Sequence, residues 1–243
     1  MQNVIRAIVL SAMVFVASPL IAQQTTERSY YGVSISGFPI GHVEFDASTE
    51  DGLYQVQGFM GSSGFFGFFI GTRYSGAVIG EIQKSTAAPR VFRGRFEARG
   101  KFAQVDMRYA KGQPSDIEHQ PPRTAQTYDV AASTTRGSVD PITALYLLLR
   151  EVNARDICKF DQMVFDGVRL SRVSVSSAQD DEGNTVCNGV YRRIGGFSDE
   201  QLQEGTDYPF RLEYAEQASG KFQVTRFLAT TDFGIAKATL RNR

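Results

Sequence analysis

The chain has 243 residues, with 26 basic and 26 acidic side chains and a formal net charge of zero. This balance excludes the strong positive field that recruits nucleic acid or an anionic membrane surface. There are only two histidines, His42 and His119, and neither stands in a metal-ligand spacing. We therefore expect no nucleic-acid partner, no metal and no cofactor.

Residues 1–22 have the plan of a secretory signal peptide. A single basic residue, Arg6, precedes an apolar run from Ala7 to Ala17, and Ala22 stands at the expected cleavage point. The run is too short to span a bilayer, and no later segment reaches roughly 18 apolar residues in a row. We expect a periplasmic or secreted product without an integral membrane segment. The alternative is an uncleaved amphipathic or membrane anchor.

Most of the chain after residue 22 alternates apolar and polar side chains, which predicts β-strands with one buried face. Turn residues such as Asp51-Gly52 and Lys111-Gly112 separate these runs at hairpin spacing. The spacing predicts about 10–12 strands in a mainly β fold, built as a strongly curved antiparallel sheet or an open β-barrel. The clearest alternating runs are 31–35, 42–45, 54–60, 103–109, 210–214 and 221–227.

Glycine and phenylalanine are interleaved between residues 58 and 76. The Lys-Ser/Thr pair of a phosphate-binding loop is missing from this run. Either the glycines allow a bent strand pair whose phenylalanines fill the core, or the run is an apolar flap that closes over a lipid-like ligand. The candidate ligand-binding residues of a concave apolar face are Phe65, Phe66, Phe68 and Phe69.

A row of cations follows on the next predicted strand, where Arg93, Arg95 and Arg99 share one face. Such a row either binds phosphate groups or an acidic partner, or it forms a solvated outer face that discourages edge-to-edge pairing.

Residues 111–137 are rich in Pro, Gln, Ser and Thr and predict a long connection, with a connection that contains one short strand as the alternative. Directly after it, Ser138 or Asp140 offers a helix N-cap, and Pro141 fills the first helical position. An apolar stripe of helical period continues to Val152, which predicts one helix near 140–152 packed against the sheet. We expect a single β-rich domain over 23–243, with two halves joined by the connection as the alternative.

Cys158 and Cys187 are the whole cysteine inventory. In an exported chain such a pair predicts a disulfide, although two free thiols are the alternative. Between the cysteines, Asp166 and Gly167 follow a predicted strand and are a typical turn pair. Asp166 is expected to accept hydrogen bonds from backbone N–H groups or to pair with Arg169. The rarer alternatives are a catalytic carboxylate and a surface site formed by Asp166, Gly167 and Arg169.

Several short motifs occur in a characteristic order: "RYSGAVIG", "APRVF", "VDPITAL", a cysteine, "VFDGVR", a second cysteine and "YRRIGGF". This order resembles the bacterial family called domain of unknown function 3108, over about residues 30–240. Val168 departs from the pattern, since relatives tend to carry Arg there. The resemblance implies an exported, β-rich envelope protein of Gram-negative bacteria and no particular activity. The matching positions are Asp140, Pro141, Ala144, Cys158, Phe165, Asp166, Gly167, Arg169, Cys187 and Gly196.

The leading functional hypothesis is a non-enzymatic cell-envelope protein that binds an apolar ligand, such as a lipid or lipoprotein acyl chain, on its concave face. Its basis is the abundance of Phe and Gly, at 18 and 23 residues. The second hypothesis is an envelope interaction or assembly module with a filled core. A hydrolase is the third, although the chain holds no G-x-S-x-G elbow and no catalytic residue stands out.

Overall fold

The computed structural model describes residues 24–62, 72–83, 86–176, 180–181 and 184–241. The expected signal peptide lies outside these residues, and so do the four candidate phenylalanines Phe65, Phe66, Phe68 and Phe69. No helix in the described ranges is both long enough and apolar enough to cross a membrane.

The described strands form one antiparallel sheet, so the mainly β prediction is confirmed. The first seven strands are β1 (Thr25–Ile35), β2 (Phe38–Glu50), β3 (Leu53–Ser62), β4 (Thr72–Gln83), β5 (Thr86–Ala98), β6 (Lys101–Ala110) and β7 (Gln113–Gln120). The others are β8 (Phe160–Phe165), β9 (Leu170–Ser176), β10 (Asp180–Asp181), β11 (Asn184–Gly195), β12 (Asp207–Glu216), β13 (Phe222–Thr231) and β14 (Gly234–Leu240).

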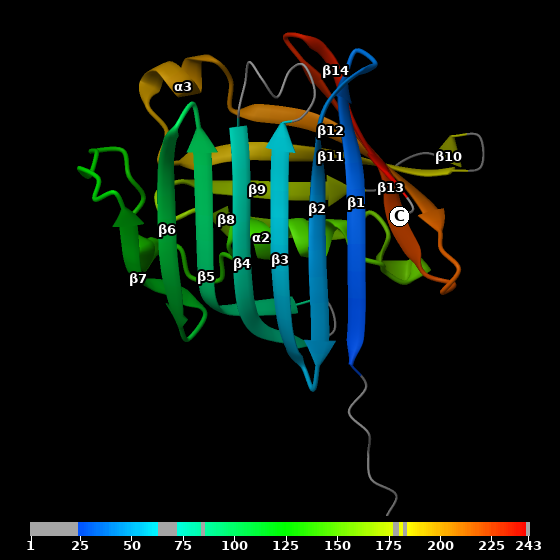
Figure 1. Ribbon diagram of the computed structural model, residues 1–243, viewed down its shortest axis with the longest axis horizontal. Helices are drawn as coiled ribbons and strands as arrows, with labels where there is room; N and C mark the ends of the chain where they lie inside the picture. Colours follow the sequence, from blue (N-terminus) through cyan, green and yellow to red (C-terminus); the bar gives the residue numbers. More distant parts are fainter. Residues whose placement is uncertain (1–23, 63–71, 84–85, 177–179, 182–183, 242–243) are drawn as a thin grey trace, which may run out of the picture.

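The order across the sheet is β7-β6-β5-β4-β3-β2-β1-β14-β13-β12-β11-β9-β8, and β10 pairs with β11. The sheet is strongly bent: β1–β7 run side by side as one wall, and β8, β9, β11 and β12 cross behind them as a second wall (Figure 1). Within the described residues the edge strands β7 and β8 do not pair with each other, so the barrel-like sheet is open.

Over the described residues the sheet has 14 strands, more than the expected 10–12. One reason is β7, which occupies Gln113–Gln120 inside the stretch that the sequence predicts to be a connection. Another is the two-residue strand β10. The predicted turns at Asp51-Gly52 and Lys111-Gly112 are present, with positive φ at all four residues. The remaining connection runs from β7 to the helix and contains the short 3₁₀ helix η1 (Ala132–Thr134).

The predicted helix is α2 (Pro141–Leu149), and it contacts strands of both walls: β3, β4, β5, β8 and β13. It ends three residues earlier than expected, because Arg150 leaves the helical conformation with ψ at 164°. The sequence predicts one apolar stripe, yet the successive residues Ile142, Thr143 and Ala144 are all buried, and successive residues lie on different sides of a helix. A helix that lies between two sheet walls is covered on most sides, so it is apolar on most sides.

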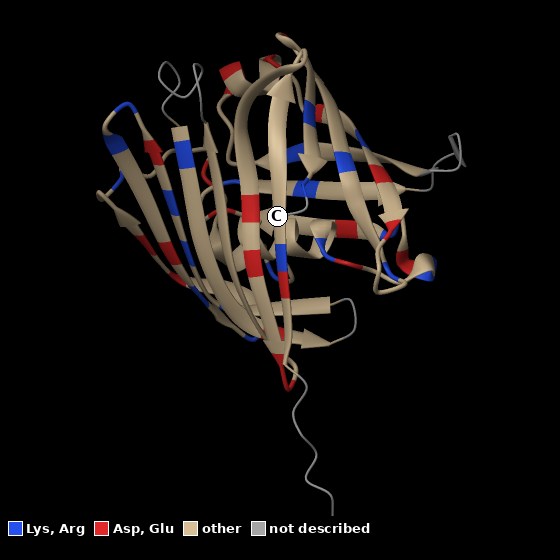
Figure 2. Cartoon of the chain, turned by 45° about the vertical axis from the view of Figure 1, so that its right-hand side comes forward, with Lys and Arg blue, Asp and Glu red and all other residues tan. Residues whose placement is uncertain are grey.

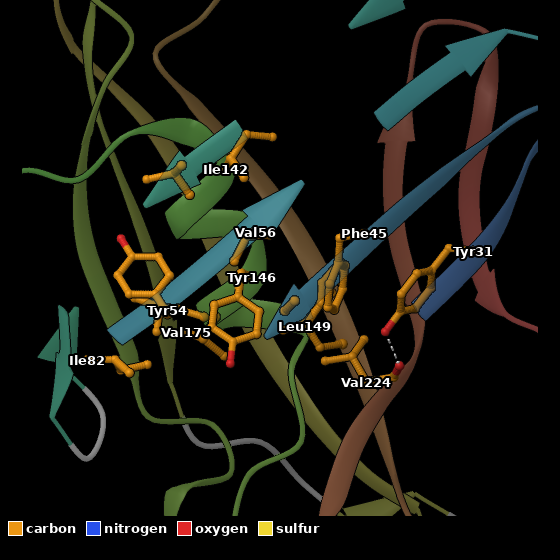
Figure 3. Close-up of a cluster of buried hydrophobic side chains, with 14 of the residues drawn as sticks. Tyr31, Phe45, Tyr54, Val56, Ile82, Ile142, Tyr146, Leu149, Val175 and Val224 are labelled. Carbon is orange, nitrogen blue, oxygen red and sulfur yellow. Dashed lines mark hydrogen bonds between the residues drawn. The ribbon is translucent and has the colours of Figure 1, made fainter. Parts of the chain in front are cut away.

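The core fills the space between the walls. Figure 3 shows Tyr146 and Leu149 of α2 among strand side chains such as Phe45 and Tyr54. Gly58 and Gly76 are paired partners on β3 and β4, and a Cβ atom at either would lie within 2.7 Å of Ile142. These two glycines of the Gly/Phe run therefore allow the helix to approach the sheet closely. The buried cluster contains side chains from before and after the 111–137 segment.

The expected helix against the sheet is present as α2, and a second, five-residue helix that was not predicted, α3 (Asp199–Gln203), lies in the connection between β11 and β12. Ser198 and Gln201 form a capping box at its start, a signal that was present in the sequence. The chain also has a short 3₁₀ helix, η2 (Ala154–Asp156), before β8.

The predicted arginine row lies on the outer face of the first wall, where acidic side chains accompany it. Arg93 pairs with Asp106, and Arg95 pairs with Glu97. Figure 2 shows basic and acidic bands next to one another on the strands of this wall. The two arginines therefore belong to a solvated outer face with balanced charge.

Candidate functional site

Cys158 and Cys187 form the predicted disulfide, with their Cα atoms 5.4 Å apart. Cys187 lies in β11, whereas Cys158 precedes β8, which begins at Phe160. Because β9 lies between β8 and β11, the bridge fastens the edge of the second wall to its interior. Both cysteines are buried, which fits a structural role.

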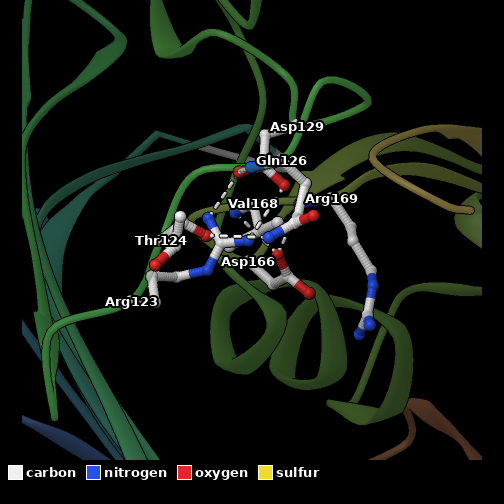
Figure 4. Close-up of polar contacts among 7 residues, drawn as sticks. All are labelled: Arg123, Thr124, Gln126, Asp129, Asp166, Val168 and Arg169. Atoms are coloured by element: carbon white, nitrogen blue, oxygen red, sulfur yellow. Dashed lines mark hydrogen bonds and ion pairs between the residues drawn. The ribbon is translucent and has the colours of Figure 1, made fainter.

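The turn between β8 and β9 is held together by Asp166. Its Oδ1 atom accepts hydrogen bonds from the backbone N–H groups of Val168, at 2.9 Å, and Arg169, at 2.6 Å. Two roles were expected for Asp166, accepting hydrogen bonds from backbone N–H groups or pairing with the Arg169 side chain. It has the first. The Arg169 side chain points away from Asp166 (Figure 4), and its guanidinium carbon lies 5.6 Å from the ring centre of Phe197.

This turn packs against the first wall. Gly167 has φ at +100°, and a Cβ atom there would lie 2.7 Å from Cγ2 of Val105 on β6. His119 on β7 lies beside this turn, and its Cε1 atom would lie 3.5 Å from a Cβ atom at Gly167. The predicted Asp166, Gly167 and Arg169 group thus lies where the two ends of the open sheet meet.

A cleft of about 540 Å³ opens beside this turn, on the concave side of the first wall; we call it the concave cleft. Strands β3 to β6 supply its apolar lining, and the polar groups come from β7, from the loop after it and from the Asp166 turn. Pro141, the first residue of α2, also borders it. The apolar side chains include Met60, Tyr74, Phe96, Ala103 and Val105, and the ionisable ones are His119, Arg123, Asp166 and Arg169.

Arg123 is fixed by a two-pronged contact with Asp129, with N–O distances of 2.6 and 3.0 Å. The Arg123 guanidinium and the Gln126 N–H group hold the pKa of Asp129 below its usual value. Partial burial lowers the pKa of His119, and the nearby Arg123 adds to this effect, so the imidazole is neutral at pH 7. Burial raises the pKa of the Tyr74 hydroxyl.

A second cleft of about 390 Å³ lies on the other side of the turn; we call it the side cleft. Arg193 lines it, donates hydrogen bonds to the carbonyl groups of Gln201 and Gly205, and lies 3.6 Å from Glu204. Its guanidinium lies over the ring of Phe197, at 5.2 Å. Asp166 and Arg169 are the two residues that line both clefts.

Asp140 begins α2 next to the concave cleft. Its Oδ1 atom accepts the N–H groups of Ile142 and Thr143, each at 2.9 Å, and Oδ2 accepts the Thr143 hydroxyl at 2.6 Å. Ser138, the alternative cap in the sequence, instead donates to the Thr135 carbonyl. Burial raises the pKa of Asp140 to about 6 despite these hydrogen bonds. Asp140 therefore fixes the helix start at the rim of the cleft.

The two histidines do not come together. His42 lies on the outer face of the first wall, where its ring is 5.2 Å from both Tyr30 and Phe59. His119 faces the concave cleft. Among the described residues, no three His, Cys, Asp or Glu side chains are grouped so that they could hold a metal ion.

Sequence reasoning missed the apolar lining of the concave cleft. The four expected phenylalanines lie outside the described residues, and Phe96 is the one phenylalanine that lines this cleft in the described chain. The period-two pattern could have identified part of this lining, because Phe96 and Ala103 are paired partners on the concave face of β5 and β6. It did not indicate which part of that face α2 leaves uncovered.

No protein-family model and no curated protein matches the chain. The expected membership in the domain of unknown function 3108 family is therefore without support. Among solved structures, the chain is similar to a β-barrel-like protein of domain of unknown function DUF1849 from Brucella abortus. The two share 14% sequence identity at a TM-score of 0.48, and the match covers 92% of this chain and 97% of that one.

Proposed function

We propose that the protein is a non-enzymatic, exported envelope protein that binds an apolar, lipid-like ligand in the concave cleft. The observation that carries this proposal is the lining of the cleft, with apolar side chains from β3 to β6 on one side and polar groups on the other. A volume of about 540 Å³ is within the usual range for small-molecule sites. A site with one apolar and one polar side fits an amphiphile.

The filled core limits where such a ligand binds. The sequence hypothesis placed it along the whole concave face, but α2 and its neighbours occupy the centre of that face. The ligand site is therefore the end of the concavity beside the start of α2, where Pro141 borders the cleft.

Two further observations support the other parts of the proposal, export and a non-enzymatic role. The disulfide is typical of proteins that fold in an oxidising compartment such as the periplasm. Two of the four ionisable groups of the cleft already have structural partners: Asp166 holds its turn, and Arg123 pairs with Asp129.

The first test is direct. The purified mature protein is extracted with organic solvent, the extract is analysed by mass spectrometry, and the delipidated protein is titrated with a fluorescent fatty acid. We expect a co-purifying lipid and saturable binding of the fatty acid. Repeated absence of both would overturn the proposal.

A matched pair of variants localises the binding. Ala103 is exposed on the concave side of β6, and Ala77 is exposed on the outer face of β4. The substitution Ala103→Trp fills the cleft and should abolish fatty-acid binding, whereas Ala77→Trp should leave it unchanged. Equal binding by both variants would contradict a ligand in this cleft.

One observation favours an interaction module as a second candidate. Phe233, Phe38 and Ile235 are 81%, 65% and 58% exposed on two neighbouring hairpins. Ser36 joins these hairpins through hydrogen bonds to the carbonyl groups of Phe233, at 3.1 Å, and Ile235, at 3.0 Å. An apolar tip of this kind suits an envelope protein partner. A pulldown that returns one stoichiometric partner with the wild type but not with Phe233→Ser would support this role.

A further inference from the structure

Arg169 occupies the border between the concave cleft and the side cleft. Its backbone N–H group is fixed by Asp166 Oδ1 (Figure 4), while its guanidinium carbon lies 5.6 Å from the ring centre of Phe197. The backbone and the guanidinium therefore have separate tasks. The backbone completes a turn, and the guanidinium lies at Phe197 in a residue that lines both clefts.

The donors of this guanidinium are unused. A guanidinium carries several N–H donors in its plane and no acceptor. In the described part of the chain, the contact of the Arg169 side chain is with the ring of Phe197, and no carboxylate or carbonyl oxygen accepts from it. A contact with an aromatic ring uses none of the N–H donors, so the edge of the guanidinium is open for a planar anion.

The neighbouring arginines differ in this respect. Arg123 is paired with Asp129 through two N–O contacts. Arg193 donates to two carbonyl groups and lies near Glu204. Among the arginines that line the two clefts, Arg169 is thus the one whose guanidinium edge has no hydrogen-bond partner in the described chain.

Asp166 is only three residues from Arg169 in the sequence, but its carboxylate does not pair with the edge of the Arg169 guanidinium. Its Oδ1 atom is turned toward the N–H groups of Val168 and Arg169, and the arginine side chain points the other way (Figure 4). His119, the other ionisable group of the cleft, is neutral at pH 7 and adds no competing charge.

We propose that Arg169 binds the anionic head of an amphiphile, a carboxylate or a phosphate monoester, whose apolar chain lies in the concave cleft; this inference rests on the proposed function. The guanidinium edge matches the two oxygens of either group. The ring of Phe197 attracts the guanidinium and helps to keep it at this border. Arg169 is accordingly the residue that sets the preference for the charge of the head group.

The test uses three ligands with the same chain, dodecanoate, dodecyl phosphate and dodecanol, each measured by displacement of a fluorescent fatty acid from the mature protein. The variants are Arg169→Gln, Arg169→Lys and the control Arg108→Gln, which removes an exposed arginine of β6 that lines neither cleft. Thermal melting checks that each variant is folded. Both variants at position 169 retain the backbone N–H group that donates to Asp166.

We expect Arg169→Gln to weaken binding of dodecanoate and dodecyl phosphate by about tenfold to a hundredfold and to leave dodecanol unchanged. Arg169→Lys should restore part of the loss, since it keeps the charge but not the planar edge. Arg108→Gln should bind all three ligands like the wild type.

The two proposals fail in different ways. Binding of all three ligands to the wild type with no selective loss in Arg169→Gln would overturn the role of Arg169 and leave the proposed function standing. An equal loss for dodecanol and dodecanoate would do the same, because it would show a general disturbance of the cleft. Failure of the wild type to bind any of the three would overturn both proposals.

Discussion

Gly167 of the β8–β9 turn lies against Val105 of β6, so the two ends of the open sheet are in contact although they share no hydrogen-bonded ladder. Gly167 has a positive φ, and a Cβ atom added to it would lie only 2.7 Å from the Val105 side chain. This contact closes the concave side at one end and creates the wall of the concave cleft.

We predict that Gly167→Ala destabilises the protein more than a glycine change that affects the backbone alone. Gly112 also has a positive φ, but a Cβ atom there would meet nothing within 4 Å. The Gly112→Ala variant should lose about 1–2 kcal/mol, and Gly167→Ala should lose about 1–3 kcal/mol more because of the clash. Urea denaturation of both variants measures this, and equal losses would show that the contact with Val105 is loose.

Asp166 should contribute through its acceptor atom and not through its charge. The Asp166→Ala variant leaves two N–H groups without their acceptor and should lose about 1–2 kcal/mol of unfolding free energy. Asp166→Asn keeps an oxygen in place and should stay within about 0.5 kcal/mol of the wild type. If Asn were as harmful as Ala, the carboxylate charge would be the important property.

Removing the disulfide should lower the stability substantially. The bridge closes a loop between residues separated by 29 positions, which corresponds to about 3–4 kcal/mol in the chain-entropy model. The double variant Cys158→Ala/Cys187→Ala should show this loss in chemical denaturation. Thiol titration of the denatured, unreduced wild type supplies the control, and two free thiols in it would contradict the bridge.

Stability should fall as the pH rises from about 4.5 to about 7, because of Glu27. Its carboxyl group accepts hydrogen bonds from the Glu151 N–H and the Gln223 side chain, and burial raises its pKa from 4.5 to about 7. A raised pKa in the folded state favours the protonated form. The contribution is therefore complete below pH 4.5 and is lost as the pH passes about 7, with an upper limit of roughly 3 kcal/mol.

The variant Glu27→Gln tests this assignment. It stays neutral at every pH, so its stability should change less than that of the wild type between pH 5 and 7 in thermal melts. Asp140 contributes in the same direction at lower pH, since its pKa is raised to about 6, and it remains in both proteins. A parallel pH profile for the variant and the wild type would exclude Glu27 as the cause.

Local features of this fold were predictable, because their causes are local. Alternation identified strands such as Tyr54–Met60, and Asp140 with Pro141 identified the start of α2. The strand β7 was only the alternative for its stretch, because the Pro and Gln residues there are also typical of a connection, although an edge strand that pairs on one side tolerates them.

The clefts were beyond sequence reasoning, because they depend on how the sheet bends. Met60 and Arg169 line the same cleft, although more than a hundred positions separate them. Period-two alternation assigned Met60 to a face of β3, but the overlap of β6 and β7 with the Asp166 turn is a property of the whole sheet. The turn itself was predicted at the correct residues, while its position beside an apolar cleft was not.

Photocrosslinking with a diazirine-labelled fatty acid tests the central claim most directly. After irradiation of the complex and peptide mapping, we predict saturable adducts on the concave positions of β3, β5 and β6, including Met60, Phe96 and Ala103, and their loss on competition with dodecanoate. Adducts confined to outer-face positions such as Ala77, or labelling that does not saturate, would contradict ligand binding in the concave cleft.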